Sequence, residues 1–246
     1  MPGTVALVQA RMGSTRLPGK VLEEIGTRPM IQWVLERVSR ARRLDRVLVV
    51  TTCLPADDQL CSWLSERGWP FYRGSELDLL DRYYQAALAA DASSVVRVTS
   101  DCPLIDADIV DRVIADRDSA GADYASNFVC KRYPIGLSAE ICTFEALRCA
   151  WKESTELHER IHATPYLYLH TDRFLICDAA GIDEDLSYLR WTVDTPDDLA
   201  MMRAMQRMAG DQLYEMSWRD ILGLVRRNPQ LERMNEHVRQ KTLREL

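Results

Sequence analysis

The stretch of this chain with the most chemical content is residues 9–20, Gln-Ala-Arg-Met-Gly-Ser-Thr-Arg-Leu-Pro-Gly-Lys. It directly follows an apolar run and contains three cations, Arg11, Arg16 and Lys20, with no acid before Glu23. Exposed backbone N–H groups beside clustered positive charge suit a polyphosphate. These residue types predict a loop that binds a chain of phosphates, and a surface loop with solvated cations is the alternative.

The spacing within this loop limits the kind of phosphate site. A P-loop has four residues between its first glycine and its Gly-Lys pair, and Ser or Thr follows the lysine. Here five residues separate Gly13 from Gly19, and Val21 follows Lys20, so the magnesium-binding hydroxyl is missing. The dinucleotide-binding pattern Gly-x-Gly-x-x-Gly is also absent. Both differences disfavour a P-loop NTPase and a nicotinamide-dependent enzyme.

Two aspartates follow strand-like runs and could hold a metal ion. Asp101 lies just past the apolar run at residues 94–99, and Asp194 ends the run Arg-Trp-Thr-Val. Carboxylates at two strand ends suit a magnesium ion that bridges to a triphosphate, although each could instead be a turn residue. Four other acids are expected to cap helices: Asp106, Asp108, Asp197 and Asp198.

Alternating strands and helices must position these residues. We expect strands at residues 5–8, 46–51, 71–73 and 94–99, and helices at 30–42, 57–66 and 77–90. This alternation predicts an α/β fold, in which helices cover both faces of a parallel sheet and ligands bind at the carboxyl ends of the strands. The loop and Asp101 both fall at such ends.

The second half has a less regular pattern. We expect helices at about 106–119, around 157–170 and from Asp197, with strands at 124–127, 136–143, 174–177 and 189–193. From Trp218 to the end, the pattern is that of an amphipathic helix with a basic tail. No repeat or linker divides the sequence, so we predict one domain at 1–216 and a helical appendage at 217–246.

Composition narrows the classes of partner. The chain has 246 residues, 47% of them hydrophobic, and a formal net charge of −6, which disfavours a general nucleic-acid or anionic-membrane surface. It has no apolar stretch near the ~20 residues that span a bilayer, and no signal-peptide pattern. Seven scattered cysteines without a CxxC pair indicate reduced thiols in a cytoplasmic protein, and no zinc site.

Four stretches resemble a known enzyme family: residues 9–22, 73–83 (Arg-Gly-Ser-Glu-Leu-Asp-Leu-Leu-Asp-Arg-Tyr), 101–106 (Asp-Cys-Pro-Leu-Ile-Asp) and 190–199 (Arg-Trp-Thr-Val-Asp-Thr-Pro-Asp-Asp-Leu). In sequence and order they resemble the spore-coat-polysaccharide type of cytidylyltransferase, which is similar to the acylneuraminate and 3-deoxy-manno-octulosonate cytidylyltransferases. The resemblance implies a Rossmann-like nucleotidyltransferase with a mostly parallel mixed sheet. It also implies CTP and Mg²⁺ as ligands, CMP transfer to an acidic sugar or related acceptor with release of pyrophosphate, and a homodimer. The nucleotide half would be about 1–105, and the acceptor and dimerisation half about 106–216.

The same motifs imply roles for individual residues. The nucleotide would meet Ala10, Arg11, Gly13, Ser14, Arg16, Lys20, Ser75 and Arg82. Asp101 and Asp194 would hold the metal, and Arg16, Lys20 and Asp101 would be catalytic. The acceptor would meet Ser138, Glu140 and His162. In this half the chain departs from the family pattern, because Ser138 and Ile161 stand where the family usually has acids.

Three other functions fit the sequence. A guanylyl- or uridylyltransferase would keep the fold and change the base, which sequence separates poorly. A glycosyltransferase of related fold is disfavoured because Asp101-Cys102-Pro103 lacks the Asp-x-Asp pair at the expected strand end. A nucleotide-binding protein without turnover is kept open by Ser138 and Ile161.

Overall fold

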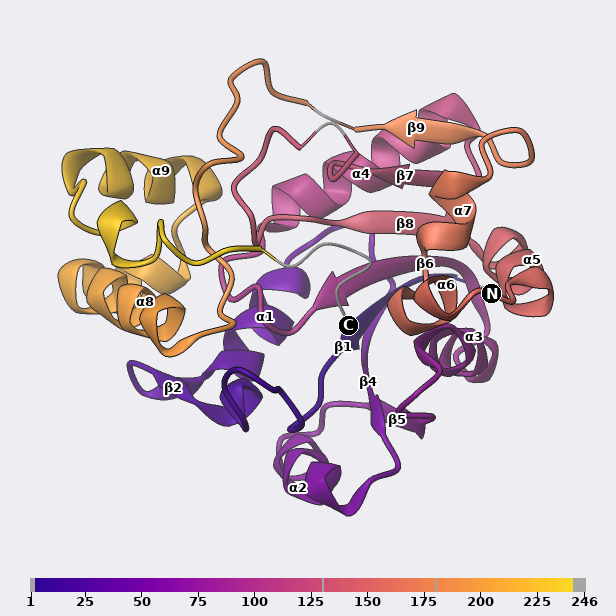
Figure 1. Cartoon of the computed structure of the whole chain (residues 1–246), viewed down its shortest axis with the longest axis horizontal. Coiled ribbons are helices and arrows are strands. Elements are labelled where there is room, and N and C mark those ends of the chain that lie inside the picture. Colours follow the sequence, from indigo (N-terminus) through magenta and orange to yellow (C-terminus); the bar gives the residue numbers. More distant parts are fainter. Residues whose placement is uncertain (1–2, 130, 180, 241–246) are drawn as a thin grey trace.

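A seven-stranded mixed sheet runs through the centre of the computed structural model, which describes residues 3–129, 131–179 and 181–240 (Figure 1). Its strands lie in the order β5 (Phe71–Gly74), β4 (Arg46–Thr52), β1 (Gly3–Gln9), β6 (Ala92–Thr99), β8 (Glu140–Thr143), β7 (Tyr124–Ser126) and β9 (Ile176–Asp178). The first four strands are parallel, β8 is antiparallel to both of its neighbours, and β7 and β9 pair in parallel. The predicted α/β fold with a mostly parallel mixed sheet is confirmed.

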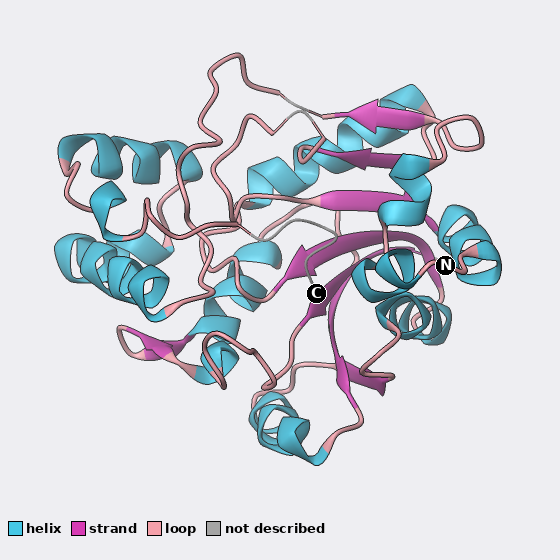
Figure 2. Cartoon of the chain, in the orientation of Figure 1, coloured by secondary structure: helices cyan, strands magenta, loops and turns pink. Residues whose placement is uncertain are grey.

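Helices cover both faces of this sheet, as Figure 2 shows. Because successive residues of a strand point to opposite faces, Ala6 and Val8 of β1 join one apolar cluster, and Val5 and Leu7 join another. The first cluster takes in residues of α1 (Met30–Val38), α2 (Asp58–Glu66), α4 (Ala107–Ala120) and α8 (Pro196–Ala209). The second takes in residues of α3 (Leu79–Ala89), α5 (Phe144–Glu153) and α7 (Pro165–Leu169).

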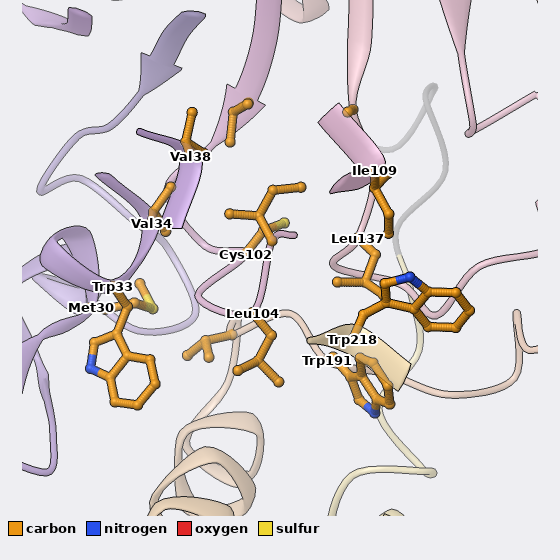
Figure 3. Close-up of a cluster of buried hydrophobic side chains, with 14 of the residues drawn as sticks. Met30, Trp33, Val34, Val38, Cys102, Leu104, Ile109, Leu137, Trp191 and Trp218 are labelled. Carbon is orange, nitrogen blue, oxygen red and sulfur yellow. The ribbon is translucent and has the colours of Figure 1, made fainter. Parts of the chain in front are cut away.

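The first apolar cluster extends beneath the two segments that carry the predicted metal ligands. Cys102, which follows Asp101, and Trp191, three residues before Asp194, are both buried in it together with Trp218 (Figure 3). Core packing therefore holds the backbone from which each aspartate extends.

The predicted elements of the first half are present, with shifts at their ends. The strands expected at 5–8, 46–51, 71–73 and 94–99 are confirmed, as are helices within 57–66 and 77–90. Helix α1 ends at Val38 rather than at residue 42, and the Ser39 hydroxyl donates a hydrogen bond to the Leu35 carbonyl at 2.7 Å there. A short hairpin of β2 (Glu24–Ile25) and β3 (Arg28–Pro29) is a feature that the sequence pattern does not predict.

The second half differs more from the prediction. The single helix expected around 157–170 is wrong, because α6 (Leu157–His162) and α7 are separated at Ala163, whose φ is +70°. Helix α5, capped by the Thr143 hydroxyl, occupies residues for which no helix is predicted. Of the strand expected at 136–143, only β8 forms. Residues 189–193 form no strand, and a lone bridge joins Arg190 to Ile135.

The C-terminal region is only partly helical. Helix α9 (Trp218–Arg227) begins at a capping box made by Ser217 and Asp220 and buries its apolar face in the first cluster. It ends before Asn228-Pro229, since the residue preceding a proline disfavours helix. Only the short 3-10 helix η4 (Glu232–Met234) follows in the described chain, so the prediction of a continuous helix is wrong for residues 228–240. Its last part, residues 241–246, lies outside the described residues.

Two further findings concern the described residues alone. No helix among them is both long and apolar enough to cross a bilayer. Their six cysteines are free thiols, while Cys130 lies outside the described residues.

Candidate functional site

The cationic loop leaves the carboxyl end of β1 and is fixed by hydrogen bonds. Met12 donates from its backbone N–H to Asp57 Oδ1 at 2.6 Å, and the Met12 carbonyl accepts from Ser14 and Gly19, each at 2.9 Å. Gly19 has φ +74°, a left-handed conformation that glycine adopts without steric cost. The loop therefore has a defined path from Ala10, which is buried against the sheet, to Lys20.

Asp57 anchors this loop from the neighbouring strand. It is 2% exposed, and its second oxygen accepts from the backbone N–H and the hydroxyl of Thr52, the last residue of β4. Sequence reasoning expected Asp57 only at a helix start. It lies five residues after the end of β4, and its partner Met12 is 45 residues away in the sequence, so no local pattern pointed to this role.

Lys20 lies between the two predicted metal ligands. Its ammonium nitrogen is 3.0 Å from Asp101 Oδ2 and 2.8 Å from Asp194 Oδ1, and it donates to the Val193 carbonyl at 2.8 Å. The segments meet because the Val193 N–H donates to the Asp101 carbonyl at 2.8 Å. The structure thus brings together three residues that lie far apart in the sequence.

Charge pairing sets the protonation of this group. Burial would raise the pKa of Asp101, but the Lys20 ammonium lowers it to about 2. Burial would lower the pKa of Lys20, but Asp101 and Asp194 raise it above its usual value. Asp101 therefore stays ionised beside the Lys20 ammonium over the physiological pH range.

The carboxylate oxygens of Asp101 and Asp194 suit a divalent cation that a bound phosphate also coordinates. Oxygens of Asp101 and Asp194 converge on one positive charge, the Lys20 ammonium, so a cation can bridge them. Among the described residues no third His, Cys, Asp or Glu completes a metal cluster. Magnesium commonly takes one or two carboxylates and fills its other positions with phosphate and water.

Asp194 has two further cationic partners. Arg16 Nη2 lies 2.8 Å from Asp194 Oδ2, and Arg190 Nη2 donates to the same oxygen at 2.9 Å. Arg190 is 5% exposed and also bonds Asp198. Sequence reasoning did not assign a role to Arg190, although it begins the motif that contains Asp194.

Arg82 is a buried cation without a counter-ion. It is 4% exposed, its side chain forms no ion pair and no hydrogen bond with a described residue, and its Nε is a buried donor without a partner. Its pKa lies below the usual value, mainly because of burial. Arg11, which adds to this effect, is half-exposed and 3.7 Å from Glu76. An unpaired buried cation is costly, so Arg82 favours a ligand that brings acceptor oxygens.

Three other predicted nucleotide contacts, Ser75, Gly13 and Ser14, lie in loops. Ser75 accepts at its hydroxyl from the Asp78 N–H at 3.1 Å, just before α3. A side chain at Gly13 would meet no atom within 4 Å, so the backbone there is open on that side. Ser14 lies beside Gly13 in the same loop.

Glu140, predicted to contact an acceptor, belongs to a buried polar network. It is 5% exposed, and it accepts from the hydroxyls of Tyr124 at 2.6 Å and Thr164 at 2.7 Å and from the Arg97 guanidinium. Arg97 Nε also donates to Gln9 Oε1 at 3.2 Å, which connects the network to the start of the loop. Sequence reasoning missed Arg97.

The two other acceptor candidates lie near this network. Ser138 is half-buried and precedes β8 by two residues. His162 ends α6, and its carbonyl accepts from the Thr164 N–H at 3.0 Å across Ala163, whose φ and ψ are +70° and −44°. This is a γ-turn in its rare strained form. Ala163 is fully buried, so the surrounding structure holds the strained turn in place.

The mixed α/β sheet places the cationic loop and the two carboxylates at the carboxyl ends of its strands, where open α/β sheets bind ligands. The family model described as cytidylyltransferase matches residues 5–209. The chain belongs to the cytidylyltransferase family.

Similar proteins span nearly the whole chain. An uncharacterized protein of Methanocaldococcus jannaschii is 34% identical over 98% of both chains. The spore coat polysaccharide biosynthesis protein SpsF of Bacillus subtilis is 30% identical over 91% of this chain and 94% of its own. The solved structure of a cytidylyltransferase from Leptospira borgpetersenii superposes with a TM-score of 0.88 at 28% identity, covering 98% of this chain and 100% of that one.

Proposed function

We propose that this chain transfers CMP from CTP to an acidic sugar or related acceptor, with Mg²⁺ and release of pyrophosphate, for a surface polysaccharide or glycoconjugate. The observation that carries the proposal is the Lys20 ammonium held between Asp101 and Asp194. A cation of the phosphate loop occupies the point at which two carboxylates converge. This arrangement suits a triphosphate and a divalent cation that bind together.

The reaction needs positioning and charge neutralisation more than covalent chemistry. An acceptor oxygen forms a bond to the α-phosphorus, and the bond from that phosphorus to the oxygen of the β-phosphate breaks, so pyrophosphate leaves. Arg16 and Lys20 exchange their carboxylate partners for phosphate oxygens and neutralise the leaving group. Asp101 and Asp194 would hold Mg²⁺, which when bound would polarise the α-phosphate.

A second group of cations, Arg11 and Arg82, also contacts the nucleotide in this proposal. Arg82 has no counter-ion in the described chain, and it lies close enough to Arg11 for the two charges to interact. Guanidinium groups donate to phosphate and to carbonyl oxygens. In this proposal Arg11 and Arg82 take acceptor oxygens of the nucleotide, beside Ser75 and the open backbone at Gly13 and Ser14.

The acceptor binds at the network around Glu140. Arg97, whose side chain keeps 17% of its surface exposed, is the cation there that can meet an acidic group of the acceptor. Strained backbone is typical of functional sites, and the turn at Ala163 holds His162 and Thr164 next to this network. Ser138 and His162 would contact acceptor hydroxyls, and Glu140 would orient Arg97.

Assembly and location are also part of the proposal. We propose a homodimer, for which the exposed side chains of Leu77 and Leu157, 79% and 61% exposed, offer apolar surface. Size-exclusion chromatography with light scattering measures this directly. A cytoplasmic location is consistent with free thiols and with CTP as substrate.

A pyrophosphate-release assay tests the proposed function. The protein is incubated with CTP and Mg²⁺ against a panel of acidic sugars, sugar phosphates and phosphonates. Release with at least one acceptor, and a CMP-linked product, is the expected result. Release only with GTP or UTP would reassign the base, and a free nucleoside diphosphate product would indicate a glycosyltransferase. CTP binding without turnover across the panel would indicate a nucleotide-binding protein.

A further inference from the structure

A fully buried carboxylate, Asp198, organises the backbone around Asp194. Its side chain is 0% exposed, and it accepts from the backbone N–H groups of Asp194 at 2.9 Å and Thr195 at 3.0 Å. It also accepts from Arg190 Nε at 2.8 Å and Nη2 at 3.0 Å. Arg190 in turn bonds the Asp194 carboxylate, so Asp198 controls both the main chain and the side chain of Asp194.

The C-terminal segment contributes directly to this group. Asn235, 2% exposed, donates from its side-chain amide to Asp198 Oδ1 at 2.9 Å and to the Arg190 carbonyl at 3.0 Å. Gln240 accepts from Arg190 Nη1. Both residues come after 209, where the family match ends. Each guanidinium nitrogen of Arg190 therefore has a partner, and one partner belongs to the C-terminal segment.

The anchoring of this segment does not depend on Asn235. Leu231 is 0% exposed in the first apolar cluster, and Ile221 and Val225 of α9 are buried there as well. The polar contacts of Asn235 are thus additional to the packing that holds the segment. A buried amide directed at Arg190 and Asp198 is costly unless its hydrogen bonds form, and here they form at the two residues that hold Asp194.

We propose that Asn235 is a positioning residue for Asp194, so that the C-terminal segment completes the metal side of the nucleotide site. Asn235 and Gln240 fix Arg190 and Asp198, which fix Asp194 in the orientation that meets Lys20. The metal part of this inference rests on the proposed function. Residues that orient metal ligands typically change metal affinity 10- to 100-fold when mutated.

The test compares Asn235→Ala with Asn228→Ala. Asn228 belongs to the same segment and donates to the Leu224 carbonyl at 2.9 Å, so it controls for general loosening. Hydrogen exchange is measured at the Asp194 and Thr195 amides. Mn²⁺ affinity is measured by electron paramagnetic resonance in the presence of CTP, and CTP affinity is measured in EDTA.

Asn235→Ala is expected to speed amide exchange at Asp194 and Thr195 at least tenfold and to weaken Mn²⁺ binding about tenfold. CTP affinity in EDTA should stay within twofold, and Asn228→Ala should behave as wild type. Gln240→Ala, at an exposed residue, should give a smaller change of the same kind. It replaces Asn235→Ala as the test variant if Asn235→Ala does not fold.

Wild-type exchange and wild-type Mn²⁺ affinity in Asn235→Ala and Gln240→Ala, or equal effects in Asn228→Ala, would overturn the positioning role. If Asn235→Ala speeds exchange but the wild-type protein binds no Mn²⁺ in the presence of CTP, the proposed function and the metal part of this inference are overturned instead.

Discussion

At the scale of single residues, the proposed function involves an exchange of partners around Lys20, from carboxylates to phosphates. Asp101 and Asp194 hold the lysine, and Arg16 and Arg190 hold Asp194, so the carboxylates are neutralised before any ligand binds. In the proposed function a triphosphate would attract the two loop cations, Arg16 and Lys20, which would leave the carboxylates for Mg²⁺. Metal and nucleotide should therefore bind together rather than independently.

Lys20→Met separates the two roles of this lysine. Without its ammonium, Asp101 and Asp194 face each other with less positive charge between them, so the nucleotide-free variant should bind Mn²⁺ more tightly than wild type. Pyrophosphate release should fall about a hundredfold or more, because a preorganised positive charge is lost. Electron paramagnetic resonance measures the first effect and the release assay the second. Unchanged values of both would contradict the exchange.

Arg82→Met should affect binding and stability in opposite directions. The buried guanidinium has no counter-ion, so a neutral side chain of similar length should leave the free energy of unfolding unchanged or raise it by about 1 kcal/mol. CTP affinity should fall at least tenfold. Arg97→Met is the matched control, since it leaves Glu140 unpaired and should destabilise the fold by about 3 kcal/mol or more. Urea denaturation and calorimetric titration measure these changes, and lower stability in Arg82→Met would be the opposite result.

The predictability of individual residues depended on whether the sequence places them after a strand-like run. Arg16, Lys20, Asp101 and Asp194 could be chosen from sequence because each follows a strand-like run, and the structure brings them into one cluster. Asp57, Arg97 and Asn235 could not, because their partners Met12, Glu140 and Asp198 lie 37 to 45 residues away in the sequence and are set by the tertiary fold. Arg190 is only four residues from its partner Asp194, but its burial is set by the tertiary fold.

At the scale of elements, the strands and helices of the first half were predictable because most of them are long and have their own apolar pattern, although β5 has only four residues. The second half contains shorter elements with irregular ends. The strained turn at Ala163 separates α6 from α7. Leu189, Trp191 and Val193 are apolar and buried, yet their segment is joined to Ile135 by a lone bridge rather than by a strand. The burial of this segment, rather than strand pairing, accounts for its pattern.

The loop should depend on its anchor at the end of β4. Asp57→Asn replaces an oxygen that accepts from Thr52 or Met12 with an amide that donates, so one buried hydrogen bond becomes a clash of donors. The expected cost is about 1 to 3 kcal/mol of unfolding free energy, with weaker CTP binding. Asp58→Asn, one residue away and exposed, is the control. Equal stability and CTP affinity in both variants would show that the anchor is dispensable.

At the scale of the whole molecule, the pairing of Asp101 makes stability depend on pH. The folded-state pKa is lowered from 3.8 to about 2, so the stabilisation is complete above pH 3.8 and is lost as pH falls toward 2. Wild-type stability should therefore fall between these values, and Asp101→Asn should show a shallower decline. Thermal melts from pH 2 to 6 test this, and parallel curves for the two proteins would contradict it.

Thermal denaturation with each of the four NTPs and Mg²⁺ tests the central claim most directly. A ligand at a hundred times its dissociation constant stabilises a protein by about 2.7 kcal/mol, so CTP should raise the melting temperature more than ATP, GTP or UTP. The shift should shrink in EDTA and in Arg82→Met. Equal shifts with all four, or none with CTP, would contradict the account.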